Sequence, residues 1–332
     1  MVKVILDAMG GDHAPDSILD GLALSIQDGF VEAGEVLVVG KRETLEPKLT
    51  ARGLSLDALV DASDDLTGDE TPVEAVRRKP QSSIAVGLRM VKEHQGDAFV
   101  SAGNTGLVVA AATLTLGCLP GIRRPGICIT VEGDQGPFMV IDVGANPQPK
   151  PRDILEYAVM GSAYYHDTYS KEQPSIGLMN IGSEEKKGNP LIKEARGLLR
   201  ESPMNFIGNV EGVDLFHGKC DVIVADGFTG NVLLKVSEGV AEYVVRTMAR
   251  LMAESGIAPE PLQKAVSKMQ ARVDYSEFGG ALLLGVDGIV TICHGRSEGR
   301  AIANAIRVAR DAVGANVNKH IASRARELSR AT

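Results

Sequence analysis

Residues 2–27 read VKVILDAMGGDHAPDSILDGLALSIQ, and this stretch decides the fold class. The β-branched run from Val2 to Leu6 predicts a strand, and the stretch from Pro15 to Gln27 predicts a helix. Two adjacent glycines between them, Gly10 and Gly11, allow a tight turn. A strand, a glycine turn and a helix in this order are typical of the start of a βαβ unit.

The same alternation continues through the first third of the chain. Further strands are predicted from Glu35 to Val39 and from Ala98 to Val100. Further helices are predicted from Arg42 to Ala51 and from Ser82 to His94, with the Ser82 side chain as N-cap. Strands that alternate with helices predict an α/β fold with a mostly parallel sheet, and ligands are expected beyond the carboxyl ends of its strands.

The alternation breaks in the middle of the chain. The β-rich stretches Ile127 to Val131 and Phe138 to Asp142 are joined by EGDQGP at 132–137, which predicts a β-hairpin. The elements expected after the hairpin are a helix from Ile154 to about Tyr165, a strand from Ile176 to Met179, a helix from Leu191 to Leu199, a strand from Val222 to Ala225, a long helix after Asn231 to about Met252, and a last helix from Gly299 to about Ala315. We expect this last helix to pack on the sheet.

Composition narrows the class of protein. The chain has 332 residues, of which 44% are hydrophobic and 23% charged, the balance of a globular enzyme with one large α/β unit or two domains. The net charge of -8 provides no overall basic field for a phosphate backbone, so we expect no nucleic-acid partner. The 37 glycines exceed the usual share, which indicates many turns whose backbone approaches a small ligand.

Cysteine spacing and the first residues indicate the compartment. Cys118, Cys128, Cys220 and Cys293 have no CxxC spacing, so we expect free thiols, no metal site and no cofactor. Asp7 and Asp12 come too early for a signal peptide. The uncharged stretch 98–122 contains polar turn residues, so we interpret it as a buried strand, a turn and a buried helix rather than a membrane span. We therefore expect a cytoplasmic protein.

Two glycine-rich loops are candidate anion sites. The loop from Asp7 to Pro15 contains Gly10, Gly11, Asp12 and His13, and backbone N–H groups before a helix favour phosphate. A tight turn capped by Asp7 explains the same residues equally well.

The second loop follows the strand at Ala98 to Val100 and contains Ser101, Gly103, Asn104 and Thr105. Its hydroxyl, amide and N–H groups suit an oxyanion, whereas the alternative is a helix N-cap by Asn104 or Thr105. Neither GxGxxG nor GxxxxGK[ST] occurs in the chain, which removes the main support for a dinucleotide site or a P-loop.

Three further loops contain groups that suit catalysis or binding. Residues 226–231, DGFTGN, place Asp226 where it acts as a general base, orients a donor or only caps a helix. Residues 180–189 contain Lys186 and Lys187, either in the site or on a solvated loop. His294 follows an apolar run at the apparent end of a strand. Small strand-to-helix loops without a Ser-His-Asp spacing indicate a site that works by positioning and by backbone donors.

Short motifs along almost the whole chain resemble those of the bacterial phosphate acyltransferase (PlsX) family of phospholipid synthesis. They are DAMGGDHAP at 7–15, GDETP at 68–72, SAGNTG at 101–106, DVGAN at 142–146, KGN at 187–189, FIGNVE at 206–211, DGFTGN at 226–231 and HG at 294–295. The chain departs from the family pattern at Leu107 and at 147–151, PQPKP.

The resemblance implies a fold and an assembly. The fold is an isocitrate/isopropylmalate dehydrogenase-like α/β/α architecture, used as a homodimer. Residues 1–125 and 285–332 form a phosphate-binding lobe, and 126–284 form a middle lobe with the hairpin, the dimer contacts and a helical hairpin. Peripheral membrane attachment through Met252, Ile257 and Leu262 is also implied.

The resemblance further implies an enzyme that moves a long-chain acyl group from acyl carrier protein (ACP) to inorganic phosphate. The acyl phosphate then serves a glycerol-3-phosphate acyltransferase. We expect phosphate between the Gly10–Gly11 loop and the 101–106 loop, and direct attack of phosphate on the thioester. The catalytic residues implied are Lys187, Asp226, Asn231 and His294, with Lys186 and Thr229 as binding residues.

The ACP partner and the competing functions complete the expectations. ACP is acidic, so a local basic face is needed, and the candidates are Arg77, Arg78, Lys79, Arg123 and Arg124. The alternatives are a phosphotransacetylase-like enzyme that uses acyl-CoA, an NAD(P)-dependent decarboxylating dehydrogenase on the same fold, and a non-enzymatic ACP-binding scaffold. Phosphate-dependent loss of acyl-ACP, NADH formation and binding without turnover distinguish these classes.

Overall fold

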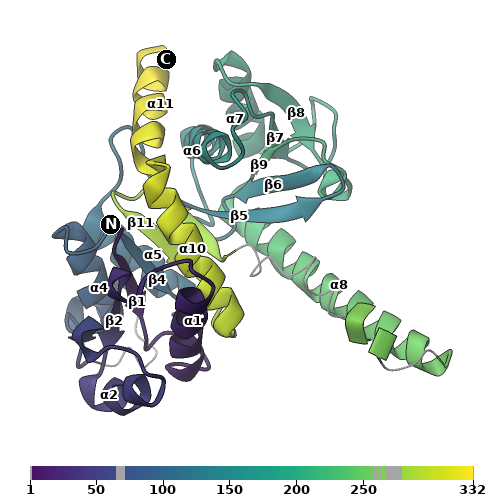
Figure 1. Ribbon diagram of the computed structural model, residues 1–332. Coiled ribbons are helices and arrows are strands. Elements are labelled where there is room, and N and C mark those ends of the chain that lie inside the picture. The colour runs from purple at the N-terminus through teal and green to yellow at the C-terminus, as the bar shows by residue number, and fades with distance from the viewer. Residues whose placement is uncertain (1, 65–71, 257–259, 262, 266–278, 332) are drawn as a thin grey trace.

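The computed structural model describes residues 2–64, 72–256, 260–261, 263–265 and 279–331, and within them eleven strands form one sheet (Figure 1). The strands are β1 Val4–Asp7, β2 Val36–Gly40, β3 Leu59–Asp61, β4 Ala98–Ser101, β5 Gly126–Gly133, β6 Gly136–Ile141, β7 Ile176–Met179, β8 Phe206–Val210, β9 Val222–Val224, β10 Ala281–Leu284 and β11 Ile289–Ile292. The α-helices are α1 Asp16–Gln27, α2 Arg42–Ala51, α3 Pro72–Arg78, α4 Ser83–Lys92, α5 Thr105–Leu116, α6 Pro151–Tyr169, α7 Pro190–Glu201, α8 Gly227–Glu254, α10 Gly299–Gly314 and α11 Val317–Ala331.

The sheet consists of two parallel blocks joined by antiparallel strands. Its order is β3-β2-β1-β4-β11-β10-β5-β6-β9-β7-β8. The block from β3 to β11 is parallel, and so is the block from β6 to β8, whereas β10 and β5 are antiparallel to both of their neighbours. The mostly parallel sheet and the β5–β6 hairpin, whose pairing runs from Cys128↔Ile141 to Gly133↔Gly136, are confirmed.

Alternate strand residues enter two cores, one on each face of the sheet. Val4 and Leu6 of β1 lie in the core with side chains of α1, α6, α10 and α11. Ile5, between them in the chain, lies in the other core with side chains of α4 and α5. Because successive side chains of a strand point to opposite faces, the sheet is the middle layer of an α/β/α arrangement.

Most predicted elements lie within a few residues of the observed ones. The Ser82 hydroxyl caps α4 by accepting a hydrogen bond from the Ala85 N–H at 3.4 Å, as predicted. The stretch 98–122 forms β4, a turn and α5. None of the helices within the described residues is both long and apolar enough to span a bilayer.

Two helix predictions were wrong. The long helix does not start after Asn231: α8 begins at Gly227, because the Asp226 side chain caps it, so Thr229 and Asn231 are helical. The helix ending near Ala315 is not the last, since α11 follows it. The sequence of α11 is mostly polar, but Val317, Ile321, Ala325 and Leu328 are buried along one face at helical spacing.

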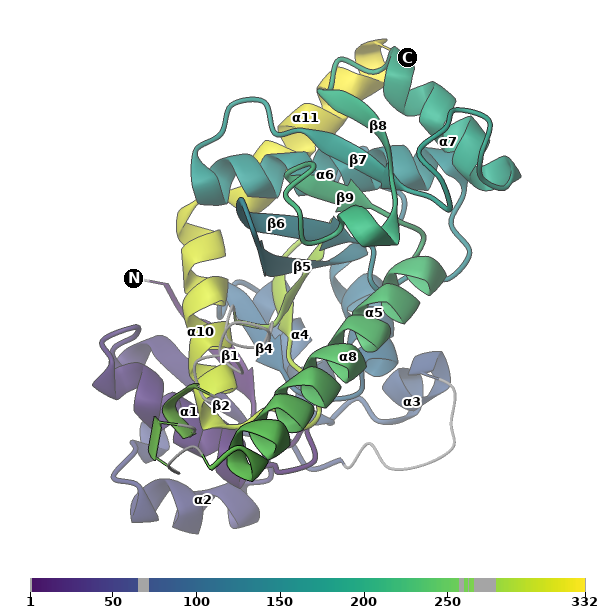
Figure 2. The same ribbon diagram turned by 90° about the vertical axis from the view of Figure 1, so that its right-hand side faces the viewer.

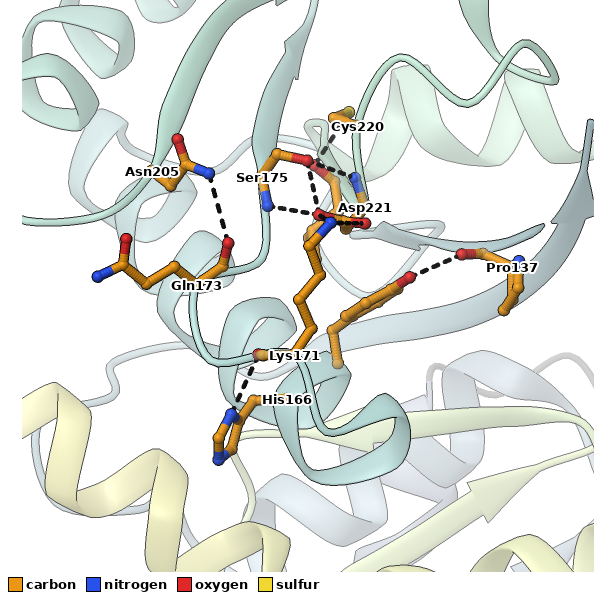
Figure 3. A network of polar contacts seen from close by, with 10 residues as sticks. Pro137, His166, Lys171, Gln173, Ser175, Asn205, Cys220 and Asp221 are labelled. Carbon is orange, nitrogen blue, oxygen red and sulfur yellow. Dashed lines mark hydrogen bonds and ion pairs between the residues drawn. The ribbon is translucent and has the colours of Figure 1, made fainter. Parts of the chain in front are cut away.

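A polar network fixes the start of the second parallel block (Figure 3). The Asp221 carboxylate accepts hydrogen bonds from the N–H and the hydroxyl of Ser175, both at 2.6 Å, and pairs with Lys171 at 2.7 Å. Burial raises the pKa of Asp221, but hydrogen bonds from Lys171 and Ser175 outweigh burial and hold this pKa below its usual range. The network connects Lys171 and Ser175, which follow α6, to Asp221, which directly precedes β9.

Helix α8 extends away from the rest of the molecule (Figure 1), and in the turned view it crosses in front of the other elements (Figure 2). Its first turns pack on the sheet, where Gly227 and Gly230 are buried, and most of its later residues are exposed. The boundary of the two predicted lobes, 1–125 with 285–332 against 126–284, stays a prediction.

Candidate functional site

Three predicted loops meet at one cavity of about 770 Å³. They are the loop after β1, the loop after β4 and the loop after β11, and these strands are parallel neighbours in the sheet. The carboxyl ends of parallel neighbours lie at the same edge, so the loops adjoin. The Asp12 N–H donates to the Gly295 carbonyl oxygen at 2.7 Å, which joins the first loop to the third.

The Gly10 backbone lies against the second loop. A Cβ atom at this position would lie 2.6 Å from the Gly103 nitrogen and 2.6 Å from Oδ2 of Asp7. A side chain at Gly10 would require the Gly103 backbone to move, which is unfavourable. Only glycine therefore fits where the two loops approach each other. Gly11 has a φ of +115°, a conformation that also favours glycine.

The Asp7 side chain connects the first loop to the second by hydrogen bonds. Its Oδ2 accepts a hydrogen bond from the Ser101 hydroxyl at 2.6 Å, and its Oδ1 accepts one from the Met9 N–H at 3.0 Å. The Ser101 oxygen in turn accepts from the Gly103 N–H at 3.0 Å. Burial raises the pKa of Asp7, and these hydrogen bonds only partly offset that effect. Asp7 therefore shapes the turn, which was one of the two interpretations of this loop.

The second loop ends in the N-terminus of α5. Asn104 is the N-cap, and its side-chain oxygen accepts from the Leu107 N–H at 3.1 Å, as the capping alternative predicted. The N–H groups of Thr105 and Gly106 open the helix without an intrahelical acceptor. Both residues line the cavity, so the positive end of the helix dipole lies beside it.

The opposite wall comes from the loop after β6 and from α8. The buried Asp142 carboxylate organises this wall by accepting hydrogen bonds from the N–H groups of Gly144, Ala145 and Asn146 at 3.0, 2.8 and 2.7 Å. Burial raises the pKa of Asp142 against these bonds. A Cβ atom at Gly230 would lie 1.9 Å from the Asp142 carbonyl oxygen, so α8 packs directly on this loop.

Packing of α8 on the 142–146 loop brings a cation into the cavity. Lys235 lines it, and its Nζ lies 3.2 Å from Nε2 of His294 and 3.0 Å from Oε2 of Glu238. Among the described lining residues Lys235 is the one lysine, and no arginine is found there. The cavity also contains the carboxylates of Asp7, Asp12 and Asp64.

The surroundings of His294 favour its neutral form. Burial lowers the pKa of His294, and the charge of Lys235 lowers it further. The Arg296 N–H points at Nδ1 from 3.3 Å, while Lys235 faces Nε2. A protonated imidazole has only donors, so it would face a donor at each nitrogen.

Several predicted site residues lie outside this cavity. The two carboxylate oxygens of Asp226 accept hydrogen bonds from Thr229, one from its N–H at 2.9 Å and one from its hydroxyl at 2.7 Å. Asp226 therefore caps α8, which was one of its predicted roles. Lys186 and Lys187 are exposed on the loop after β7, and Nζ of Lys187 lies 4.0 Å from Glu184. None of these residues, nor the exposed His13, lines the cavity. Asn231 does line it.

The predicted docking and membrane residues have separate places. Arg77 and Arg78 end α3, with Lys79 after them. Arg123 pairs with the buried carboxylates of Asp153 at 3.0 Å and Glu156 at 2.9 Å, while Arg124 is exposed. Met252 lies near the end of α8, whereas Ile257, Leu262 and most of the GDETP motif lie outside the described residues.

Sequence reasoning missed Lys235, Glu238 and Asp142. Lys235 and Glu238 follow Asn231 at helical spacing. With the correct start for α8, the sequence predicts Asn231, Lys235 and Glu238 on neighbouring turns of one helix. Asp142 is the first residue of the DVGAN motif, but the sequence predicted no role for its side chain.

Comparison with known proteins decides the family. Residues 2–320 match the family described as "Fatty acid synthesis protein". A phosphate acyltransferase of Heliobacterium modesticaldum is 43% identical over 96% of this chain and 98% of that protein. A phosphate acyltransferase of Halothermothrix orenii is 42% identical over 95% of this chain and 96% of that protein. The chain belongs to the phosphate acyltransferase family. The predicted resemblance and the predicted acyltransferase class are thereby confirmed.

Solved structures share the fold of this phosphate acyltransferase family member at low identity. A phosphotransacetylase from Streptococcus pyogenes has a TM-score of 0.60 and 17% identity, covering 94% of both chains. A 4-hydroxythreonine-4-phosphate dehydrogenase from Klebsiella pneumoniae has a TM-score of 0.51 and 14% identity, covering 94% of this chain and 98% of that one. The mixed α/β fold is thus shared with a transacetylase and a dehydrogenase, while the finer fold name stays a prediction.

Proposed function

We propose that this protein transfers a long-chain acyl group from acyl-ACP to inorganic phosphate and releases acyl phosphate. One observation carries the proposal: the carboxyl ends of β1, β4 and β11 meet at a cavity that faces Lys235. Small loops, a helix N-terminus and one cation suit a small anion. Membership of a phosphate acyltransferase family supports phosphate as that anion.

Phosphate binds where the Gly10–Gly11 loop and the 101–106 loop adjoin. The N–H groups of Thr105 and Gly106 are the available helix donors there, and Lys235 supplies the charge from the opposite wall. Because Asp7, Asp12 and Asp64 also line the cavity, the anion needs this cation and the helix end to offset their repulsion.

The reaction needs positioning rather than a covalent enzyme intermediate. An oxygen of hydrogen phosphate attacks the thioester carbonyl carbon, a C–O bond forms, and the C–S bond breaks with its electron pair on sulfur. The phosphate hydroxyl proton ends on that sulfur, so acyl phosphate and free thiol are the products. Thiolate is a good leaving group, so donors aimed at the carbonyl oxygen supply most of the catalysis.

We assign the charge stabilisation to Lys235 in place of Lys187. Lys235 lines the cavity and is held between His294 and Glu238, whereas Lys187 is on the loop after β7 and lies outside the cavity lining. His294 and Asn231 remain candidates for contact with substrate because both line the cavity. Asp226 and Thr229 act through α8, whose start they fix.

The donor side of the proposal involves a protein partner. The chain carries -8 net charge, so acidic ACP needs a local basic face, and Arg77 and Arg124 are exposed candidates for it. Arg123 is the poorest candidate, because it already neutralises Asp153 and Glu156.

A homodimer is also proposed, and α8 supports it. One side of this helix carries exposed apolar side chains at helical spacing. They are Val232, Val236, Val240, Tyr243, Val244, Met248 and Leu251. A second copy of the chain would remove this surface from water. We further propose a cytoplasmic location, with peripheral membrane attachment near Met252.

One assay tests the function. Purified protein is mixed with palmitoyl-ACP, with and without inorganic phosphate, and loss of the thioester and formation of palmitoyl phosphate are followed by mass spectrometry. Phosphate-dependent conversion supports the proposal. Conversion of palmitoyl-CoA but not palmitoyl-ACP favours the phosphotransacetylase-like alternative, and binding of palmitoyl-ACP without conversion favours a scaffold.

A further inference from the structure

The cavity has two chemically different halves. We call the glycine-rich loops and Lys235 the rim of the cavity, and its aliphatic lining residues from β5, β10 and the elements beside them the floor. The floor residues come from the two antiparallel strands and their neighbours. They are Ile127, Ile129, Val143, Leu234, Ala281 and Ile292. The described lining residues include no Phe, Tyr or Trp, and the floor residues are all aliphatic, so the floor offers no stacking surface for a nucleotide base.

Within the described residues, the helices on one face of the sheet pack mainly on its two sides and less on its middle. Ile127, Ile129, Ala281 and Ile292 belong to the core on the face of α4 and α5. On that face α4 and α5 pack beside the first parallel block, and among the described helices α8 reaches the same core through Leu233 and Leu234 in its first turns. Beyond Lys235 most side chains of α8 are exposed, Val236 to 58%, although Val245 is buried. Strands β5 and β10 lie between these two coverings.

We propose that this floor binds the alkyl chain of the acyl donor, which runs over Ile129 and Ala281 between α5 and α8. The inference rests on the proposed function, because it takes the occupant of the cavity to be a fatty acyl thioester. Floor and rim residues line one cavity, so an alkyl chain on the floor places its carbonyl carbon near Lys235 and the N-terminus of α5. Removal of alkyl groups from water against an aliphatic surface is favourable, and each added methylene adds to affinity.

The floor predicts which substitution changes chain preference. Ala281→Phe fills the floor from β10, and Ile129→Ala enlarges it. In Ala281→Phe the ratio of kcat/KM for palmitoyl-ACP to that for butyryl-ACP falls by about tenfold or more. The KM for phosphate stays within about twofold, since the rim is unchanged.

A matched control separates the floor from general core damage. Leu282→Ala removes a buried aliphatic side chain from the same central strands, but Leu282 faces the other core. Leu282→Ala therefore lowers the melting temperature as Ile129→Ala does and leaves the chain-length ratio unchanged. An equal change of the ratio in Leu282→Ala and Ile129→Ala overturns the proposal.

A binding measurement keeps this inference distinct from the function. Dodecylphosphonate and ethylphosphonate, which carry the same anionic head on long and short chains, are titrated calorimetrically into wild type and Ala281→Phe. Weaker binding of dodecylphosphonate alone in the variant supports the floor even if no acyl-ACP is turned over. Equal binding in both proteins overturns the floor, while phosphate-dependent turnover would still stand on its own.

Discussion

The Lys235 ammonium nitrogen lies 3.2 Å from Nε2 of His294, and this contact joins two walls of the cavity that are 59 residues apart in the chain. Lys235 belongs to α8, which packs on the loop after β6, and His294 follows β11 in the first parallel block. The contact therefore spans the antiparallel middle of the sheet. Any change in the angle between the two blocks alters the position of the cation over the phosphate site.

Replacement of Lys235 by methionine is expected to lower kcat/KM for phosphate by about a hundredfold, because the cavity loses its cation while its carboxylates remain. Steady-state kinetics with palmitoyl-ACP measures the effect. Lys187→Met is the matched control and should stay near wild type, since Lys187 lies outside the cavity lining. The opposite result, a silent Lys235→Met and an inactive Lys187→Met, would return the catalytic role to the loop after β7.

The ionisation of His294 is expected to respond to its neighbours with a defined sign. Burial and the Lys235 charge lower the pKa of His294, while Glu238 and Asp12 raise it less, and Arg296 lowers it. Lys235→Met should therefore raise this pKa, and Glu238→Gln should lower it. Titration of the ring proton signals by NMR measures both shifts, with His13→Gln simplifying the spectrum. Movement in the same direction in both variants would contradict the charge arrangement.

The stability contribution of His294 follows from the same shift. A histidine with a depressed pKa resists protonation in the folded state, so its contribution is complete above the unfolded pKa and is lost as the pH falls through the folded pKa.

Gly103→Val is expected to abolish phosphate-dependent turnover while the protein stays folded. A Cβ atom at Gly103 meets Oγ of Ser101 at 3.1 Å and Ile84 at 3.2 Å, so the added methyl groups enter the space beside the phosphate loops. Circular dichroism checks the fold and the phosphate dependence of the rate checks the site. An unchanged phosphate KM in a folded Gly103→Val protein would move the anion elsewhere in the cavity.

Local sequence patterns predicted the first half of the fold well. The strand–turn–helix order around Gly10 and Gly11 and the hairpin around 132–137 depend on turn chemistry and β-branched runs, which act over short distances. The strand β10 was missed although it forms a local antiparallel pair with β11 across residues 285–288. Its second partner, β5, is more than 140 residues away in the chain, and that pairing has no local pattern.

The sequence predicted which loops line the candidate site, but it did not predict the charged residues that α8 contributes. Gly10, Gly103 and His294 follow strand ends, and the parallel register brings strand ends together. Lys235 and Glu238 lie a turn or more inside a helix, where charged residues are usually solvated. Their place in the cavity depends on how α8 packs on the loop held by Asp142, a tertiary contact without a local pattern.

Asp221→Asn is expected to destabilise the protein by about 2 kcal/mol near neutral pH, because charged hydrogen bonds to Ser175 and Lys171 are lost. The pKa of Asp221 is lowered in the folded state, so its contribution is present above the unfolded pKa and is lost as the pH falls through the folded pKa. Urea unfolding of both proteins at neutral and strongly acidic pH measures this. A difference that does not shrink in acid would show that the carboxylate charge is not responsible.

The docking of acyl-ACP is expected to depend on exposed arginines and not on Arg123. Arg77→Glu and Arg124→Glu reverse charges on exposed positions, so each should raise the KM for acyl-ACP at low salt if it faces the acidic partner. The effect should shrink as salt screens the attraction, and the KM for phosphate should hardly move.

Arg123→Glu cannot serve as such a test. Its guanidinium neutralises Asp153 and Glu156, whose side chains are only 7% and 4% exposed, and reversal leaves these carboxylates unpaired beside a third. We therefore expect Arg123→Glu to lower the melting temperature strongly, whereas Arg77→Glu and Arg124→Glu leave it near wild type. Equal KM values for acyl-ACP in wild type, Arg77→Glu and Arg124→Glu at low salt would exclude both positions as the dock.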